Sequence, residues 1–178
     1  MVAKKKVLYI SIDCEVDGPA PPAVGSMFWF GAVVVEPGLK RTFNGPLHPI
    51  SNYYEAERLA ISGLIREQTL LFPQPEIVMP LFAKWVRAVG IGRRPELISD
   101  NNGFDWGLMN YYLWKYASEN PLGHTSQNIN SLYKGLKRDV RSSFRHLVVT
   151  PHDHNPVNDA IGHAEAFMAF APELGITF

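Results

Sequence analysis

The sequence predicts an α/β fold in which helices cover a mixed β-sheet. Two apolar segments, residues 6–13 and 27–36, flank a loop rich in proline and glycine at residues 18–26. A turn signal at residues 36–40 then separates the second segment from a third strand-like stretch. After this three-stranded meander, helical and strand-like patterns alternate to the end of the chain, which is typical of one sheet with helices packed on it.

The composition supports a single folded domain over residues 1–178. Hydrophobic residues make up 46% of the chain and charged residues 19%, which favours a sizeable core and argues against disorder. The formal net charge of zero excludes a strongly basic coat for nucleic acid but allows a local basic patch. The single cysteine, Cys14, excludes an intrachain disulfide framework and a cysteine-rich zinc site.

The chain shows no secretory or membrane-spanning signal. Its N-terminal apolar run is short and interrupted by acid, which does not fit a signal peptide. No apolar run reaches the length of a membrane span. We therefore expect a soluble, cytoplasmic protein.

Strands are expected wherever a short apolar run is bounded by turn residues. The first is expected to be buried on both faces, and the second and third to pair as an antiparallel hairpin. The expected ranges are 6–13, 27–36, about 40–47 and 95–100, with a strand-like or extended segment over 147–150.

Helices are expected where apolar residues recur at intervals of three and four. The first is expected to begin at Ser51 or Asn52, which are favourable N-cap residues, with Glu55 in its first turn. The later helices are expected over 75–89, about 105–118 and 156–171, with a short helix within 126–138.

An acidic pair, Asp13 and Glu15, stands at the end of the first strand. Residues two apart in a strand point to the same face, so these carboxylates lie close together. Like charges that close repel unless a cation lies between them, and hard oxygen ligands suit Mg²⁺ or Mn²⁺. The pair alone also fits a solvated strand end. Asp17 precedes Gly18, and we interpret it as turn chemistry only.

Two further segments carry acids at the start of a helix, where α/β folds place their sites. Asp105 opens the helix after the fourth strand, a position that the helix dipole also favours for an acid. Asp159 lies in the first turns of the last helix, opposite its apolar stripe, and is expected to face a cleft or water. Several ionisable residues lie near it in the sequence: His152, Asp153, His154 and His163.

Together these residues form a coherent catalytic set. Four carboxylates, those of Asp13, Glu15, Asp105 and Asp159, could hold two divalent ions about 4 Å apart that clamp the attacking and leaving oxygens of a phosphodiester. His154 could take the proton from the attacking water.

With these residues the chain resembles the DEDDh exonucleases, a family that includes the proofreading subunit of bacterial DNA polymerase, RNase T and oligoribonuclease. The resemblance covers essentially the whole chain. In the tyrosine version of the family the third motif is Tyr-x3-Asp, and Asn155 occupies that tyrosine position here, so the histidine version fits. The three motifs occur in order as Asp13-x-Glu15, Asn101-x-x-Phe104-Asp105 and His154-x4-Asp159.

The resemblance implies a ribonuclease H-like fold with a five-stranded mixed sheet flanked by helices. It implies two Mg²⁺ or Mn²⁺ ions on the four carboxylates, with His154 as the general base. The implied activity is metal-dependent 3′–5′ hydrolysis at the 3′ end of single-stranded RNA or DNA, releasing nucleoside monophosphates. RNA and DNA stay undecided, because no residue can be assigned to a 2′-hydroxyl contact.

The sequence departs from the family around the terminal nucleotide. Asp100 stands where proofreading relatives often carry histidine, and the run after Glu15 resembles an Asp-Gly-Pro…Ser-Met variant of small stand-alone members. The backbone near Gly18 is expected to approach the terminal nucleotide, with Asn101 nearby. Three apolar residues are expected either to pack on its base or sugar or to lie in the core: Met27, Phe28 and Phe104.

Basic residues cluster ahead of the third motif. Their spacing of three and four predicts one basic helix face, which would either follow a phosphate backbone or be solvated. The residues of this face are Lys134, Lys137, Arg138 and Arg141, and Arg145 follows them.

Two other functions stay open. One is a non-catalytic nucleic-acid-binding module on the same fold, and the other is a metal-dependent nucleotide phosphohydrolase. A homodimer is also compatible with the sequence, since small stand-alone relatives often pair.

Overall fold

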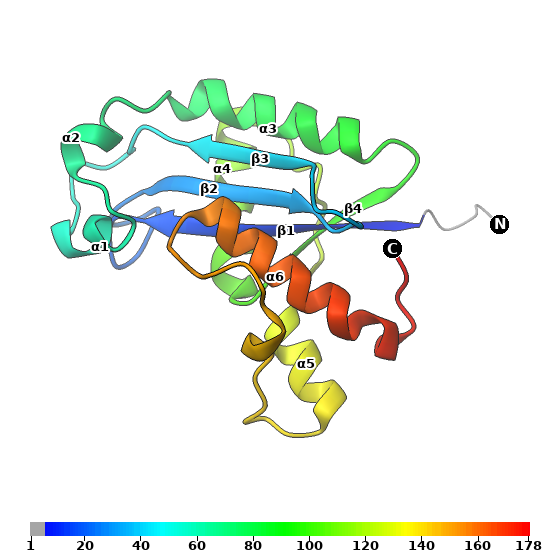
Figure 1. The fold of residues 1–178 in the computed structure, drawn as a ribbon. Coiled ribbons are helices and arrows are strands. Elements are labelled where there is room, and N and C mark those ends of the chain that lie inside the picture. The colour runs from blue at the N-terminus through cyan, green and yellow to red at the C-terminus, as the bar shows by residue number, and fades with distance from the viewer. Residues whose placement is uncertain (1–5) are drawn as a thin grey trace.

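The first apolar run forms the middle strand, β1, of a five-stranded mixed sheet. Figure 1 shows β1, β2 and β3 side by side. The computed structural model describes residues 6–178. In the order β3-β2-β1-β4-β5, the first three strands are antiparallel, and β4 and β5 run parallel to β1. The predicted fold class and hairpin are therefore confirmed. The strands are β1 (Val7–Val16), β2 (Met27–Val34), β3 (Thr42–Pro46), β4 (Arg94–Ser99) and β5 (Ser126–Asn128).

Helices cover both faces of this sheet. On one face, α3 (Pro75–Val89) and α4 (Asn102–Ala117) bury a core that includes Ile10, Ile12 and Cys14 of β1. On the other face, α6 (Pro156–Phe170) crosses β1 and β2, with α5 (Ile129–Lys137) beside it (Figure 1). Because strand residues alternate between faces, the odd-numbered residues of β1, Asp13 and Glu15 among them, point toward α6.

The region between β3 and α3 differs from the prediction. The first helix begins at Ala56 instead of Ser51 or Asn52, so α1 (Ala56–Ile61) is shorter than expected. The amide of Ser51 donates to Ser26 Oγ at 3.0 Å, which ties this backbone to the loop after β1 and keeps it out of the helix. A second short helix, α2 (Arg66–Thr69), follows.

The second half of the chain also departs in detail. The short helix expected within 126–138 is α5, and residues 126–128 ahead of it pair with β4 as β5. Asn128 caps α5 by accepting from Ser131 N at 2.6 Å. Of the two alternatives for residues 147–150, the strand is wrong: a 3₁₀ turn, Arg145–Leu147, leads into a loop there. The extended alternative fits Val148 (φ −77°, ψ 130°). A second 3₁₀ turn, Ala171–Leu174, ends α6. None of the helices in residues 6–178 combines the length and apolar character that a membrane span requires.

A buried ion pair fastens the loop after β1 to α2. Arg66 Nη1 lies 2.7 Å from Asp17 Oδ2, and the same carboxylate accepts the Ser26 amide. Burial raises the pKa of Asp17, although the Ser26 amide and the Arg66 guanidinium both act to lower it. Asp17 therefore has a structural role that goes beyond a turn, because it holds together the segments that border the end of β1.

Replacing Arg66 with alanine should lower the free energy of unfolding by about 3–5 kcal/mol, because the buried Asp17 carboxylate loses its counter-charge. Urea unfolding measures the loss. Arg41→Ala is the matched control, since Arg41 pairs with Glu36 at the surface and should cost less than about 1 kcal/mol. Equal losses in the two variants would contradict the structural role of the buried pair.

Candidate active site

Three of the predicted catalytic carboxylates meet at the C-terminal end of β1. Oxygen atoms of Asp13, Glu15 and Asp159 lie within 4.8 Å of one another. The first two come from the α6-facing side of β1, and the third comes from the first turn of α6. The strand and the helix therefore bring together acids that are far apart in the sequence.

The sequence left two environments possible for Asp159, a cleft or bulk water. Its side chain is fully buried, because α6 packs against the sheet with this residue turned toward β1. The alternative in which the Asp159 side chain is exposed to water is therefore wrong, and the alternative in which it lies in a cleft is confirmed. Oδ2 of Asp159 lacks an aligned hydrogen-bond donor in the described part of the chain, although His152 Nδ1 lies 2.9 Å away.

Asp105 approaches the same strand end from α4, which begins three residues earlier than predicted. Its Oδ1 accepts the backbone amide of Cys14 at 3.1 Å, and the side chain is almost wholly buried. The carboxylate thus holds the residue between Asp13 and Glu15. It stands next to the 4.8 Å cluster of the other three acids and is not part of it.

Burial and nearby negative charges raise the pKa values of Asp13, Glu15 and Asp105. The pKa of Asp13 lies well above its usual range, mainly because of burial and then because of the charges on Asp105 and Glu15. Burial is also the main cause that raises the pKa of Glu15 to about 7 and the pKa of Asp105 to about 7. Clustered, desolvated carboxylates are unfavourable alone and are stabilised by a divalent cation. The all-oxygen set and the unpartnered Asp159 oxygen therefore fit such a cation.

Two histidines lie at the edge of the cluster. His154 has a left-handed backbone (φ 60°), and its Nδ1 is 3.9 Å from Glu15 Oε1, with 40% of the side chain exposed. His152 reaches Asp159, and the two imidazole centroids are 4.4 Å apart. The sequence singled out His154 and did not assign the contact of His152; the only signal for it was the density of histidines in this tract.

The loop that carries both histidines is fastened to α6 by Glu165. The Glu165 carboxylate accepts the amides of Val149 and Thr150 at 2.9 and 2.7 Å and the Thr150 hydroxyl at 2.9 Å. Sequence reasoning missed this residue, because its partners are backbone groups of a loop with no pattern of its own.

Of the predicted contacts to the terminal nucleotide, those of Met27 and Phe28 need correction, and those of Gly18, Asn101 and Phe104 stay predictions. Met27 and Phe28 are completely buried in the core, so their side chains cannot pack on a nucleotide. Gly18 is buried against Gly25, where a Cβ would lie 2.8 Å from Gly25 Cα, so packing explains this glycine. Phe104 is partly buried against the core, and Asn101 stays exposed at the start of α4.

The predicted basic helix face does not form as a unit. The helix α5 ends at Lys137, and Arg138 follows in the left-handed conformation (φ 52°), so Arg141 leaves the helical spacing. Lys137 Nζ pairs with Glu173 at 3.2 Å, while Lys134 stays on α5. The basic residue that reaches the catalytic region is Arg145, which lines a cavity together with Asp13.

One protein named for its activity is similar in sequence to most of this chain. The 3′–5′ DNA exonuclease Cap18 of Escherichia coli is 30% identical over 171 residues, which span 91% of this chain and 90% of that protein. This chain belongs to the DEDD-type 3′–5′ exonucleases of the ribonuclease H-like fold. No protein-family model matches this exonuclease.

Solved structures share the fold of this exonuclease. They include the cell-death related nuclease CRN-4 (TM-score 0.72, 13% identity), covering 95% of this chain. A full-length 3′-exonuclease (TM-score 0.73, 13% identity) covers 96%. E. coli Exonuclease I in complex with a dT13 oligonucleotide (TM-score 0.67, 11% identity) also covers 96%. This chain spans 64%, 62% and 43% of those three chains, less than two thirds of each.

The first turn of α6 lies directly against β2 at Gly31. A Cβ atom at Gly31 would lie 2.2 Å from the carbonyl carbon of Pro156 and 2.3 Å from the nitrogen of Val157. Gly31 is also the partner of Asp13 in the β1–β2 register. The absence of a side chain there lets the turn that carries Asp159 come close to Asp13.

Gly31→Ala should lower the free energy of unfolding by about 1–3 kcal/mol and reduce the exonuclease rate, because the added methyl group displaces the turn that carries Asp159. Urea unfolding and initial rates measure the two effects. Gly107→Ala in α4 is the control: its Cβ meets nothing within 4 Å, and it should stabilise the helix by about 0.5–1 kcal/mol. Wild-type stability and rate in Gly31→Ala would refute this close approach.

Proposed function

We propose that this chain hydrolyses the 3′-terminal phosphodiester of single-stranded DNA and releases nucleoside 5′-monophosphates. The observation that carries the proposal is the meeting of the Asp13, Glu15 and Asp159 carboxylates at one buried strand end. The name of the relative Cap18 supports DNA as the substrate, and the complex of Exonuclease I with dT13 supports a single strand.

We further propose that Asp13, Glu15, Asp105 and Asp159 hold two Mg²⁺ or Mn²⁺ ions. When bound, ions of this kind would neutralise the negative charge of the phosphate and lower the pKa of a bound water molecule. The side chains supply the position: the strand spacing projects Asp13 and Glu15 together, and Asp105 fixes the strand between them through the Cys14 amide.

His154 is the proposed general base. Its ring lies at the rim of the carboxylate cluster, where a neutral imidazole nitrogen can accept the proton of an attacking water. His152 instead lies against Asp159, and we assign it no proton transfer. The Glu165 contacts keep the loop, and therefore both rings, close to α6.

A gel assay on 5′-labelled single-stranded DNA and RNA of equal sequence tests the proposal. With Mg²⁺ or Mn²⁺ the DNA should shorten stepwise from its 3′ end, and EDTA should stop the reaction. Asp13→Ala and Asp159→Ala should be inactive, with circular dichroism showing the wild-type fold. Faster shortening of RNA would reassign the sugar, while no shortening of either strand would contradict the proposal.

His154→Ala should lower the rate by about 10²–10⁴-fold, the usual contribution of a general base. His152→Ala is the matched comparison, because its ring is 4.4 Å away and should cost less than about tenfold. Single-turnover rates measure both variants. The opposite ranking would make His152 the base.

A further inference from the structure

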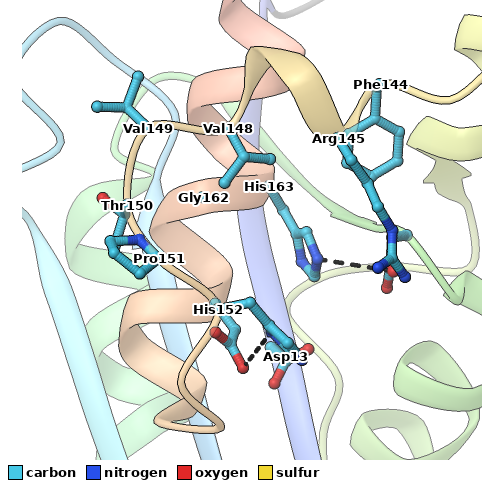
Figure 2. A pocket seen from close by; sticks show the side chains of 12 residues that line it. Asp13, Phe144, Arg145, Val148, Val149, Thr150, Pro151, His152, Gly162 and His163 are labelled. Carbon is cyan, nitrogen blue, oxygen red and sulfur yellow. Dashed lines mark ion pairs between the residues drawn. The ribbon is translucent and has the colours of Figure 1, made fainter.

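A cavity of about 310 Å³ lies beside the catalytic carboxylates (Figure 2). Its charged lining consists of three acids, Asp13, Asp100 and Asp159, and one cation, Arg145. The loop before His152 supplies an apolar wall that includes Val148 and Pro151. The cavity therefore offers a nucleotide three kinds of surface at once: acidic, apolar and cationic.

Arg145 is the cationic end of this cavity. It is the only arginine or lysine among the described residues that line the space, and its guanidinium forms no ion pair within residues 6–178. Arg141, four residues earlier, differs because it pairs with Asp139 at 3.6 Å and does not line the cavity. The charge of Arg145 is thus available to an anion.

The position of Arg145 is set by its buried neighbour. Phe144 is 4% exposed, and its ring packs edge-on against His163, with centroids 6.2 Å apart. The 3₁₀ turn then closes through the Leu147 amide, which donates to the Phe144 carbonyl at 2.8 Å. This anchoring holds the base of the Arg145 side chain at the cavity wall.

His163 is a second polar side chain at this cavity. Only 9% of this residue is exposed, it lines the cavity, and its Nδ1 has no hydrogen-bond partner in the described chain. Its Nε2 is 3.6 Å from Asp100 Oδ2, too long for a good hydrogen bond. Because this Nδ1 atom is itself shielded from solvent, we assign the contact to an anion in the cavity to Arg145 and not to His163.

We propose that this cavity is a nucleotide subsite in which Arg145 binds a phosphate and the wall of Val148 and Pro151 contacts the attached sugar or base. The proposal rests on the proposed function, because it concerns the substrate of the same site. The carboxylates of Asp13, Asp100 and Asp159 repel an anion and Arg145 attracts it, so the cavity orients the nucleotide with its phosphate toward Arg145. The phosphate belongs either to the bound strand or to the released nucleoside monophosphate.

Two measurements on wild type, Arg145→Ala, Arg145→Lys and Arg141→Ala test the subsite. Steady-state rates on oligo(dT) give KM and kcat, and calorimetric titration with thymidine 5′-monophosphate gives Kd, both with Mg²⁺. Arg145→Ala should raise KM, Kd or both by about 10–100-fold, the factor for one lost hydrogen bond to a charged group. The kcat should change less than about threefold, because Arg145 stands apart from the reacting bond.

The controls separate charge from geometry. Arg145→Lys should recover part of the affinity, since it keeps the charge and loses the planar fork. Arg141→Ala should match wild type, because that side chain is 90% exposed and outside the cavity. A change in KM alone assigns the phosphate to the strand, and a change in Kd alone assigns it to the released nucleotide; both support the subsite.

Unchanged KM and Kd in Arg145→Ala would overturn the subsite and leave the exonuclease activity standing. A wild-type chain that cleaves no oligonucleotide would instead overturn the proposed function. In that case the monophosphate titration alone decides the subsite: weaker binding by Arg145→Ala supports it, and equal or absent binding refutes it.

Discussion

The repulsion among buried carboxylates at the end of β1 is the constraint on which the rest of the structure depends. Asp13, Glu15 and Asp159 are held closer than charged acids would settle alone. Burial, and then the neighbouring charges, raise the pKa values of Asp13 and Glu15. A sheet edge or an exposed loop could not hold them in this way. The middle strand of a sheet covered on both faces can, because its backbone is fixed from both sides.

Contacts from several elements hold these carboxylates in place despite their repulsion. The bare Gly31 admits the first turn of α6, and Asp105 holds the Cys14 amide from the opposite face. The ion pair between Asp17 and Arg66 secures the loop that leaves β1. These contacts lie in different elements, so the site is a property of the whole fold.

Local features of the sequence predicted the parts of the structure that depend on local rules. Strand alternation predicted that Asp13 and Glu15 share a face, and helical spacing predicted α3 (Pro75–Val89) at its observed bounds. The short strand β5 has no apolar alternation and is defined only by its pairing with β4, so no local sequence pattern predicted it. The prediction of one basic helix face was wrong because the left-handed turn at Arg138 ends the helix, and no local pattern in the sequence indicated that turn. The Glu165 contacts join distant segments and are invisible to periodicity.

The pH dependence of unfolding, with and without metal, tests the central claim most directly. Glu15 and Asp105 have ordinary pKa values near 4 and folded values of about 7, so between these limits the folded chain binds more protons than the unfolded one. Stability in EDTA should therefore fall by several kcal/mol as pH rises from about 4.5 to about 7.5, at about 1.4 kcal/mol per unit of pKa shift. Saturating Mn²⁺ should remove this fall by stabilising the ionised acids. Stability that is flat or rises with pH in EDTA, and does not respond to Mn²⁺, would contradict the account.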